Sequence, residues 1–532
     1  MTLTVLVLLP LLGAVVVALL PKRRPELVFP VALGVSILPL AASLWILVNF
    51  ASGDASFQFT EDYVLSETFG FGWRLGIDGI SLFMVVLTGI LMPLSIGVSK
   101  SITERPKQFM VAMLILETGL LGVFISLDLL LFFAFFEIVL VPMYLLIGIW
   151  GSDNRLYAAI KFVLFTAFGS IFLLAGIIVL GIDAGDSIGT STSFDFRTML
   201  SLDISSTAQI WLFLAFGIAF AIKVPIFPFH TWLPDAHTDA PTAGSVILAG
   251  VLLKMGAYGF LRFNLTLFPE ASVDLALYVG ILGVIGIIYG AAVAIVQPDI
   301  KRLVAYSSVS HMGFVILGIF ALTSQGLSGA VFIMISHGLV TGALFLLIGM
   351  IYERRHTRQI SEYGGLAKIM PIYAGIFLFM AFASVGLPGL SGFIGEFGVL
   401  LGSYLTLPVL AIIAGAGVIL AAVYMLWAYE RVFTGPVTNP KNEGLSDLGF
   451  REIAILVPLI VIVIGIGVYP QPVFDRIDPS VEIILDRIEA TTDYEVPEYG
   501  RADEVVEPAD VHSDISTSET DEAEHGDEEG SG

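Results

Sequence analysis

Residues 221–245 read "AIKVPIFPFHTWLPDAHTDAPTAGS" and place a lysine, four prolines and two histidines between long apolar stretches. A hydrocarbon core of about 30 Å takes about 20 residues of helix, and the flanking stretches are long enough to cross it. Proline removes a backbone donor and clashes with the preceding turn, so this segment predicts a transmembrane helix that is broken within the membrane. Such a break is tolerated only where it faces protein or water, and it therefore marks a candidate ion site.

The whole chain has the composition of an integral membrane protein. Of its 532 residues, 56% are hydrophobic and 14% are charged, and the mean hydropathy is +0.91, whereas soluble domains carry about 25% charged residues. The first apolar run is followed by "PKRRPE" without a small-residue cleavage site, so it predicts a first membrane helix and not a signal peptide.

Cysteine is absent from the chain, which excludes thiolate ligation of iron–sulfur clusters, disulfides and cysteine nucleophiles. Haem ligation by histidine or methionine has no attachment motif to support it. No nucleotide-binding loop, nucleophile elbow or kinase signature occurs either. We therefore expect no cofactor in this chain and no soluble catalytic activity.

The apolar runs, divided at glycine, proline and charged interruptions, predict an all-α membrane protein of about 14 transmembrane helices. The predicted spans are 2–20, 27–50, 77–98, 109–126, 128–150, 157–181, 208–232, 241–263, 273–296, 302–322, 327–351, 370–406, 408–432 and 452–470. The seventh is expected to be broken by its prolines, and the twelfth within "SVGLPGLSGFIGEF" at 384–397.

The two halves of the chain echo each other. In each half, a helix with an ionisable residue at mid-membrane depth is followed two helices later by a broken helix. Helix 5 with Glu137 comes before broken helix 7, and helix 10 with His311 comes before broken helix 12. Because five helices separate the corresponding pairs, the second unit would be inverted across the membrane. This predicts two inverted five-helix repeats, helices 4–8 and 9–13, which form a core over about residues 109–433.

Basic residues predict the orientation. The loops after helices 1, 3, 5, 9, 11 and 13, with adjoining helix ends, carry 17 lysines and arginines. The loops after even-numbered helices carry three, Arg74, Arg197 and Arg262. The positive-inside rule then predicts a multi-pass protein of the cell membrane with both termini outside.

The end of the chain differs in composition. A polytopic membrane domain is predicted over 1–472, followed by an acidic, largely disordered tail over 473–532. Within it, Glu489–Gly532 holds 16 acidic residues and one basic residue, which is −15 of the total −22. A segment this charged cannot bury enough apolar surface to fold.

Few ionisable residues fall at membrane depth, where a charge costs about 2.5–3.5 kcal/mol even on lenient scales. They are Glu117, Glu137, Lys223, Lys254, His311, His337 and Glu396. A lone membrane histidine is often only an interhelical hydrogen bond, but these groups together predict a proton relay, because histidine exchanges protons near neutral pH.

Glu137 and Lys223 form the most informative pair. A buried Glu–Lys pair can switch between ionised and neutral forms as water or a neighbouring charge changes, which would make it a proton switch. Two alternatives remain open: a fixed ion pair that only sets helix register, and a lysine that snorkels to the membrane surface. Lys254 lies near the midplane of helix 8.

Two histidines of the opening segment, His230 and His237, lie near Asp235 and Asp239. A metal site is an alternative there, but the spacing matches no standard zinc motif, and gating and capping are favoured. Asp239 precedes "APTAGS" as a candidate N-cap. The roles of Glu117, Asp78 and Asp128 stay ambiguous between function and capping.

Several long motifs point to a family. They are "FFEIVLVPMYLLIGIWG" (135–151), "KVPIFPFHTWLPDAHTDAPTAGSVILAGVLLKMGAYGFLRF" (223–263), "DIKRLVAYSSVSHMGFVILG" (299–318), "SHGLVTGALFLLIGMIYER" (336–354), "GLPGLSGFIGEF" (386–397) and "GVYPQPVFD" (467–475). Over about residues 75–475, the chain resembles the chain M-type (mitochondrial subunit 4-like) family of antiporter-like, proton-pumping membrane subunits of respiratory complex I.

The resemblance implies 14 helices, broken helices 7 and 12, and proton translocation coupled to quinone reduction elsewhere in an NADH–quinone oxidoreductase. It implies partners of the chain L and chain N types and redox subunits that hold the iron–sulfur clusters and quinone. Chain N and the D-type subunit of multisubunit cation/proton antiporters, which would exchange sodium for protons, remain alternatives, as does a non-transporting scaffold. The residues that match translocation positions of the family are Glu137, Lys223, Lys254, His311, His337 and Glu396.

Overall fold

Thirteen helices in the described part of the chain, residues 1–501, are long and apolar enough to cross a membrane in this computed structural model. A fourteenth crossing is made by two shorter helices, α17 (Pro371–Val385) and α18 (Ser391–Thr406), which meet end to end at the predicted break in helix 12. The predicted fold class is confirmed. Residues 502–532, most of the predicted acidic tail, lie outside the described residues.

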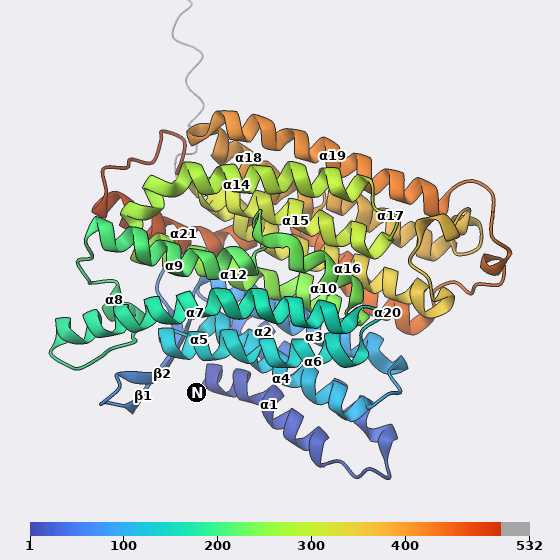
Figure 1. Ribbon diagram of the computed structural model, residues 1–532, viewed down its shortest axis with the longest axis horizontal. Helices are drawn as coiled ribbons and strands as arrows, with labels where there is room; N and C mark the ends of the chain where they lie inside the picture. Colours follow the sequence, from blue (N-terminus) through green and yellow to red (C-terminus); the bar gives the residue numbers. More distant parts are fainter. Residues whose placement is uncertain (502–532) are drawn as a thin grey trace, which may run out of the picture.

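The helices run along one direction and form a single bundle (Figure 1). The long uninterrupted helices are α1 (Thr2–Leu19), α2 (Val28–Asn49), α3 (Gly79–Val98), α4 (Pro106–Ile125), α7 (Arg155–Ile188), α9 (Ser206–Lys223), α14 (Pro269–Ile295), α15 (Ile300–Ile319), α16 (Ser324–Arg355), α19 (Pro408–Phe433) and α20 (Phe450–Val468). The predicted helix 5 is two helices, α5 (Leu129–Ile138) and α6 (Leu140–Trp150). The predicted helix 8 consists of α11 (Thr242–Ile247), α12 (Leu253–Gly259) and α13 (Leu265–Leu267) joined by two π-helical segments.

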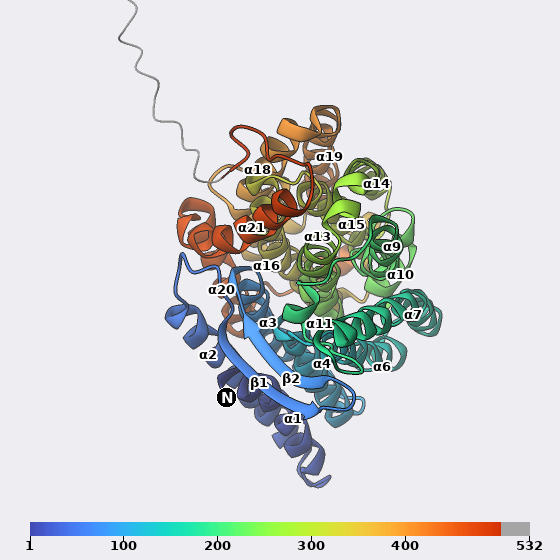
Figure 2. The same cartoon turned by 90° about the vertical axis from the view of Figure 1, so that its left-hand side faces the viewer.

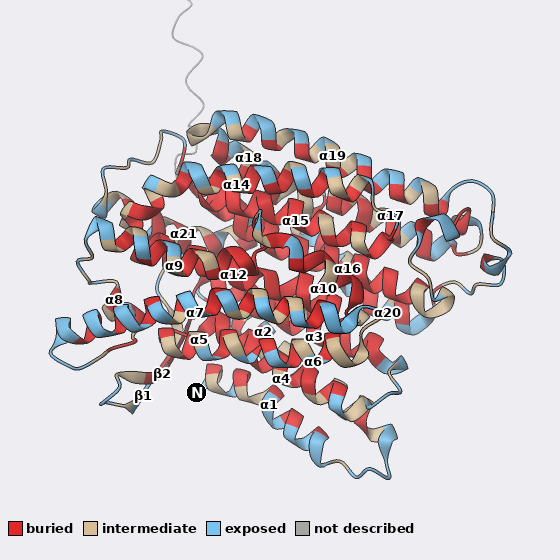
Figure 3. Ribbon diagram, viewed as in Figure 1, coloured by how far each residue is buried: buried red, intermediate tan, exposed pale blue. Residues whose placement is uncertain are grey.

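The interior of the bundle is built on α16 and the α11–α13 segment. Their most apolar stretches are buried completely inside the protein, whereas α1, α2, α7, α14 and α19 expose apolar side chains on their outer faces. Figure 3 shows this contrast between the buried centre and the outer helices. Every backbone hydrogen bond of a helix is internal, so the outer helices can face lipid and the inner ones can carry polar side chains.

Glycines bring α16 and α18 into close contact. A Cβ atom on Gly329 would lie 2.7 Å from the backbone nitrogen of Val399, and one on Gly395 would lie 2.8 Å from that of Ile333. Only glycine allows two membrane helices to approach this closely. The contact places the half-helix that carries Glu396 against the helix that carries His337.

A β-hairpin that the sequence analysis missed covers one end of the bundle. Strands β1 (Gln58–Ser66) and β2 (Phe71–Ile77) pair antiparallel. The available signal was the enrichment of "FTEDYVLS" in residues that favour strands, Phe59, Thr60, Tyr63 and Val64. Glu61 of β1 accepts the backbone N–H of Leu3 at 2.7 Å and of Thr4 at 3.3 Å, and so caps the start of α1.

The predicted boundary of the acidic tail at residue 473 is wrong, because helix α21 (Gln471–Thr491) is ordered and lies across the same end of the bundle (Figure 2). Its buried residues recur every three or four positions, which gives an amphipathic helix. They are Val473, Ile477, Ser480, Val481, Ile484, Leu485 and Ile488. The prediction rested on the overall acidic composition and did not consider the periodic spacing of these buried residues.

After α21, the chain folds back onto the start of α16. The backbone oxygen of Gly500 accepts the N–H of Ser324 at 2.8 Å, and Arg501 forms ion pairs with Glu482, Asp486 and Glu489 of α21. The last described residues are therefore held against α16 and α21 by a hydrogen bond and ion pairs.

The order of elements agrees with two five-helix units, because the fourth crossing of each is interrupted: α9 ends early in the first unit, and α17 and α18 are separate in the second. The inverted symmetry that relates the two units stays a prediction.

Candidate functional site: a buried line of titratable groups

The break in helix 7 begins at Lys223, the last residue of α9. The chain then turns through Pro225 and Pro228 and resumes as helix α10 (Trp232–Asp239). Trp232 donates its indole N–H to the backbone oxygen of Ile222 at 2.9 Å, so one carbonyl released by the break is satisfied by a side chain. This is how a membrane protein tolerates a helix end in its interior.

Lys223 is buried within the protein, with 1% of its surface exposed. Its ammonium nitrogen has no hydrogen-bond partner among residues 1–501 and lies 4.4 Å from the centre of the Phe136 ring. The alternative of a lysine that snorkels to the surface is therefore wrong. The ammonium group is held by an aromatic face, a cation–π contact.

Glu137 lies in the last turn of α5, one residue after that aromatic ring, and accepts a hydrogen bond from the Ser170 hydroxyl of α7. The ring of Phe136, the residue before Glu137, contacts the Lys223 ammonium group, which places Glu137 close to the lysine. Within the described chain, however, the two residues form no ion pair at 4.0 Å or less. The structure does not contain the fixed Glu–Lys ion pair, and the two groups are poised near each other without contact.

The junction beside Glu137 was missed in the sequence. Helix α5 ends at Ile138 and α6 starts at Leu140. Pro142 is the available signal, because it has no N–H to donate to the carbonyl four residues earlier, that of Ile138. Glu137 therefore sits at an interruption, as does Lys223.

Lys254 is fully buried in α12, between the π-helical segments Leu248–Leu252 and Phe260–Asn264. Its ammonium nitrogen donates to the backbone oxygen of Ala249 and lies 2.7 Å from Nδ1 of His337. Wide π turns are frequent at functional sites. No pattern in the sequence predicts these two π-helical segments.

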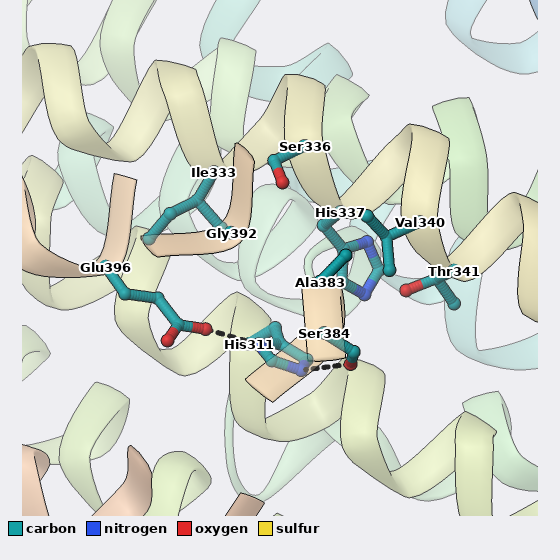
Figure 4. Close-up of a pocket in the computed structure, with 10 residues that line it drawn as sticks. All are labelled: His311, Ile333, Ser336, His337, Val340, Thr341, Ala383, Ser384, Gly392 and Glu396. Carbon is teal, nitrogen blue, oxygen red and sulfur yellow. Dashed lines mark hydrogen bonds and ion pairs between the residues drawn. The ribbon is translucent and has the colours of Figure 1, made fainter. Parts of the chain in front are cut away.

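His337 leads on to His311. The two rings have centroids 5.6 Å apart, and Nδ1 of His311 lies 3.0 Å from Oε1 of Glu396. Between the histidines is a cavity of about 20 Å³ that both rings and Glu396 line, large enough for one water molecule, which needs about 10–15 Å³. Figure 4 shows His311 pointing at Glu396 and at Ser384, with His337 across the cavity.

Two further polar groups at this end were not predicted. Nε2 of His311 lies 3.3 Å from the Ser384 hydroxyl and 3.4 Å from the Tyr424 hydroxyl. A serine and a tyrosine within apolar runs carry no distinguishing pattern, so only the fold assigns them to the site. Four predicted residues thus form one chain in the order Lys254, His337, His311 and Glu396.

The remaining interval, from Lys223 to Lys254, has no direct contact within residues 1–501. The two helices nevertheless pack tightly there. A Cβ atom on Gly256 would lie 2.6 Å from the oxygen of Phe220 and 2.9 Å from the nitrogen of Val224. The end of α9 is therefore pressed against α12 two residues beyond Lys254.

Other residues singled out in the sequence have separate positions. Asp78 caps α3 and pairs with Arg262, and Asp128 caps α5 and pairs with Arg74 at 2.6 Å, so both are capping residues. Glu117 is completely buried, and neither carboxyl oxygen has a partner among the described residues.

The capping role expected for Asp239 is wrong. The N-cap of α11 is Pro241, which makes no side-chain cap. Asp239 instead accepts the Ser152 hydroxyl at 2.7 Å and the N–H of Asn154 at 3.1 Å, because it ends α10 next to the start of α7. His237 is buried against the Phe345 ring, with centroids 4.9 Å apart.

A polytopic helical bundle with a line of lysine, histidine and glutamate side chains through its interior defines an antiporter-like membrane protein. The chain belongs to the NADH:quinone oxidoreductase/Mrp antiporter transmembrane family, whose model matches residues 126–422. This confirms the resemblance on which the sequence analysis relied.

Relatives with known names extend over nearly the whole chain. NADH-quinone oxidoreductase subunit M of Rhodobacter capsulatus is 46% identical over 498 residues, covering 92% of this chain and 97% of its own length. NADH-ubiquinone oxidoreductase chain 4 of Marchantia polymorpha is 44% identical over 482 residues, with coverage of 90% and 96%.

Solved structures agree with these relatives. A chain of respiratory complex I from Thermus thermophilus with bound NADH is 33% identical and covers 92% of this chain and 100% of its own, with a TM-score of 0.83. A chain of the Mrp complex from Dietzia sp. DQ12-45-1b is 20% identical, with coverage of 91% and 99% and a TM-score of 0.76, and shares the fold.

Proposed function

We propose that this chain is a proton-translocating membrane subunit of a complex I-type quinone oxidoreductase, with no redox centre of its own. The observation that carries the proposal is the buried contact series from Lys254 through His337 and His311 to Glu396. Its partners would be membrane subunits of the chain L and chain N types and, through them, subunits that hold the iron–sulfur clusters and the quinone.

Coupling would act first on Glu137 and Lys223. A change in the charge of a neighbouring subunit would draw the Glu137 carboxylate toward or away from the Lys223 ammonium group. When the carboxylate moves away, the buried ammonium loses its compensating charge and releases its proton more readily. The half-buried Glu137 is free to take part, since one serine hydroxyl is its hydrogen-bond donor.

The released proton would cross to Lys254 through water, because no side chain bridges that interval. It would then pass along His337 and His311, whose rings can accept a proton on one nitrogen while they lose one from the other. Glu396 would be the last acceptor of the series. Protons are favoured over metal cations as the cargo, because the two buried lysines would repel a metal ion.

The test is proton pumping per quinone reduced, measured with the intact complex in sealed vesicles. Lys223→Ala and Glu137→Ala are expected to abolish pumping while the complex still assembles, and Lys441→Ala, an exposed lysine far from the axis, serves as the matched control. Lys223→Arg separates this proposal from a scaffold role, since arginine keeps the charge but does not release a proton. Normal pumping in Lys223→Ala would overturn the proposal.

The partners are tested independently by purification of the chain with its native companions in mild detergent and mass spectrometry of what co-purifies. Subunits with iron–sulfur clusters and a quinone site are expected. Recovery of small membrane subunits alone would contradict the assignment and indicate a cation/proton antiporter.

A further inference from the structure

An apolar groove runs along the outside of the bundle between α4 and the α5–α6 pair, with the end of α1 beside it. It encloses about 670 Å³. One wall is α4, and the other continues through the α5–α6 junction. The apolar residues that line it are Val111, Ala112, Ile115, Ile138, Val141, Pro142, Leu145 and Ile149. Several of these are open to the outside, Val141 at 61% exposure.

The groove is one leaflet long. From Ile138 to Ile149, eleven helical steps of 1.5 Å give about 16 Å, roughly half of a 30 Å hydrocarbon core. A groove of this length matches one acyl chain within a single leaflet. It is too short to accommodate a transmembrane helix of a partner along its full span.

The groove ends at a group of cations. Arg105 and Lys107 line this end together with Trp150. The Arg105 side chain is exposed and makes no hydrogen bond or ion pair within residues 1–501. Lys107 donates to the backbone oxygens of Ala18 and Leu20, at the end of α1, which fixes its ammonium group at the mouth of the groove.

A third cation and the tryptophan complete this end. Arg155 donates to the backbone oxygen of Ile149 at 2.8 Å, next to the groove. The indole N–H of Trp150 is bonded to the backbone oxygen of Glu104 at 2.7 Å, the position of an interfacial anchor. Three cations, Arg105, Lys107 and Arg155, outnumber the two exposed carboxylates at this end, Glu104 and Asp153, so this end favours an anion.

We propose that the groove binds one anionic phospholipid, with its acyl chain against Val141 and Ile115 and its phosphate between Arg105 and Lys107. Charge complementarity and leaflet length both support this occupant, and basic pockets between membrane helices on the positively charged side bind anionic headgroups. Since Ile138 directly follows Glu137, the acyl chain would close the lipid side of the α5–α6 junction. This inference does not depend on the proposed function.

The test uses the purified complex in nanodiscs of phosphatidylcholine and phosphatidylglycerol, with the phospholipid that stays bound after transfer to detergent measured by mass spectrometry. Arg105→Gln is expected to lower retained phosphatidylglycerol about fivefold, the effect of about one basic residue at a headgroup. Val141→Trp fills the groove and is also expected to lower retained phosphatidylglycerol about fivefold. The matched controls are Lys441→Gln, an exposed cation in another loop, and Ile412→Trp, an exposed apolar position on α19.

Unchanged retention in both Arg105→Gln and Val141→Trp would overturn the proposal. A second measurement identifies the occupant directly. Because the chain has no cysteine, Val141→Cys gives this chain a single thiol for a photoreactive maleimide, and the wild-type complex, whose other subunits keep their cysteines, gives the background. Cross-linking to phospholipid is expected, and cross-linking to a partner subunit would mean that protein covers the groove.

Discussion

The side chains of Lys254 and His337 meet at 2.7 Å, although one belongs to the first five-helix unit and the other to the second. Both are buried, so an ammonium and an imidazolium cannot coexist at this distance without severe repulsion. The contact can therefore hold at most one excess proton between the two units.

At this contact we predict that His337→Ala lowers proton pumping about a hundredfold, the scale on which positioned acid–base groups act. Quinone reduction that is not coupled to pumping should persist, because the change removes no redox group. The matched control is His356→Asn, which alters an exposed histidine at a left-handed position that asparagine tolerates. Equal losses in both variants would refute a specific role for His337.

At the residue scale, the sequence predicts which groups titrate inside the membrane but not how they connect. Glu137, Lys223 and Lys254 stand out because charge in an apolar run is costly. Their order, and the participation of Ser170, Ser384 and Tyr424, follow from helix rotation and packing. No local pattern records those.

Among the elements, the α16–α18 contact depends on backbone proximity. We predict that Gly329→Ala destabilises the protein by about 1–3 kcal/mol, the usual cost of overpacking, because its Cβ would meet the backbone of α18. Gly375→Ala in α17 is the matched control, since nothing lies within 4 Å of its Cβ. The measurement is the thermal unfolding midpoint in detergent, and equal midpoints for the two variants would contradict the packing argument.

The hairpin holds α1 through Glu61, outside the membrane-spanning segments. Partial burial alone would raise the pKa of Glu61, but hydrogen bonds from the Thr4 hydroxyl, from the N-terminal ammonium group of Met1 and from the N–H groups of Thr4 and Leu3 outweigh it and lower the pKa below its ordinary 4.5. A lowered folded-state pKa stabilises the cap above about pH 4.5, and this stabilisation is lost as the pH falls through the folded value.

We therefore predict that acidification below about pH 4.5 frees the start of α1. Amide exchange at Leu3 and Thr4, corrected for its intrinsic pH dependence, should accelerate on acidification. In Glu61→Gln, the corrected exchange rate at Leu3 and Thr4 should already be high at neutral pH and should not rise further on acidification. A wild-type profile that matches the variant would show that Glu61 is not the cap.

Elements with strong apolar signals were predicted well, since a membrane helix needs about 20 apolar residues. The elements missed are those that lie on the membrane surface. β1, β2 and α21 mix charged and apolar residues and are held by contacts with the ends of the bundle, which a hydropathy scan does not detect. The interruption between α5 and α6 could have been predicted from Pro142, because proline removes a specific hydrogen bond.

At the scale of the whole molecule, the distribution of basic residues predicts sidedness. The hairpin and α21 share one end of the bundle (Figure 2), and we expect that end to face outward. Ser56→Cys, in the segment before β1, should react with a membrane-impermeant maleimide in intact cells. Lys441→Cys should react only after permeabilisation. The reverse pattern would invert the topology.

The complete burial of the α11–α13 segment has a consequence for biosynthesis. This segment carries Lys254 and Arg262, and in the folded protein its apolar centre has no side that faces lipid. It therefore cannot be stable in the bilayer as a separate helix. Its neighbours α3 and α9 precede it in the chain and are made first, so Asp78, the partner of Arg262, is already present when Arg262 is made. Lys254 must wait for α16, some 80 residues later. During that interval the Lys254 amine has only the backbone oxygen of Ala249, in its own segment, as a partner, and a membrane chaperone or insertase would have to shelter it.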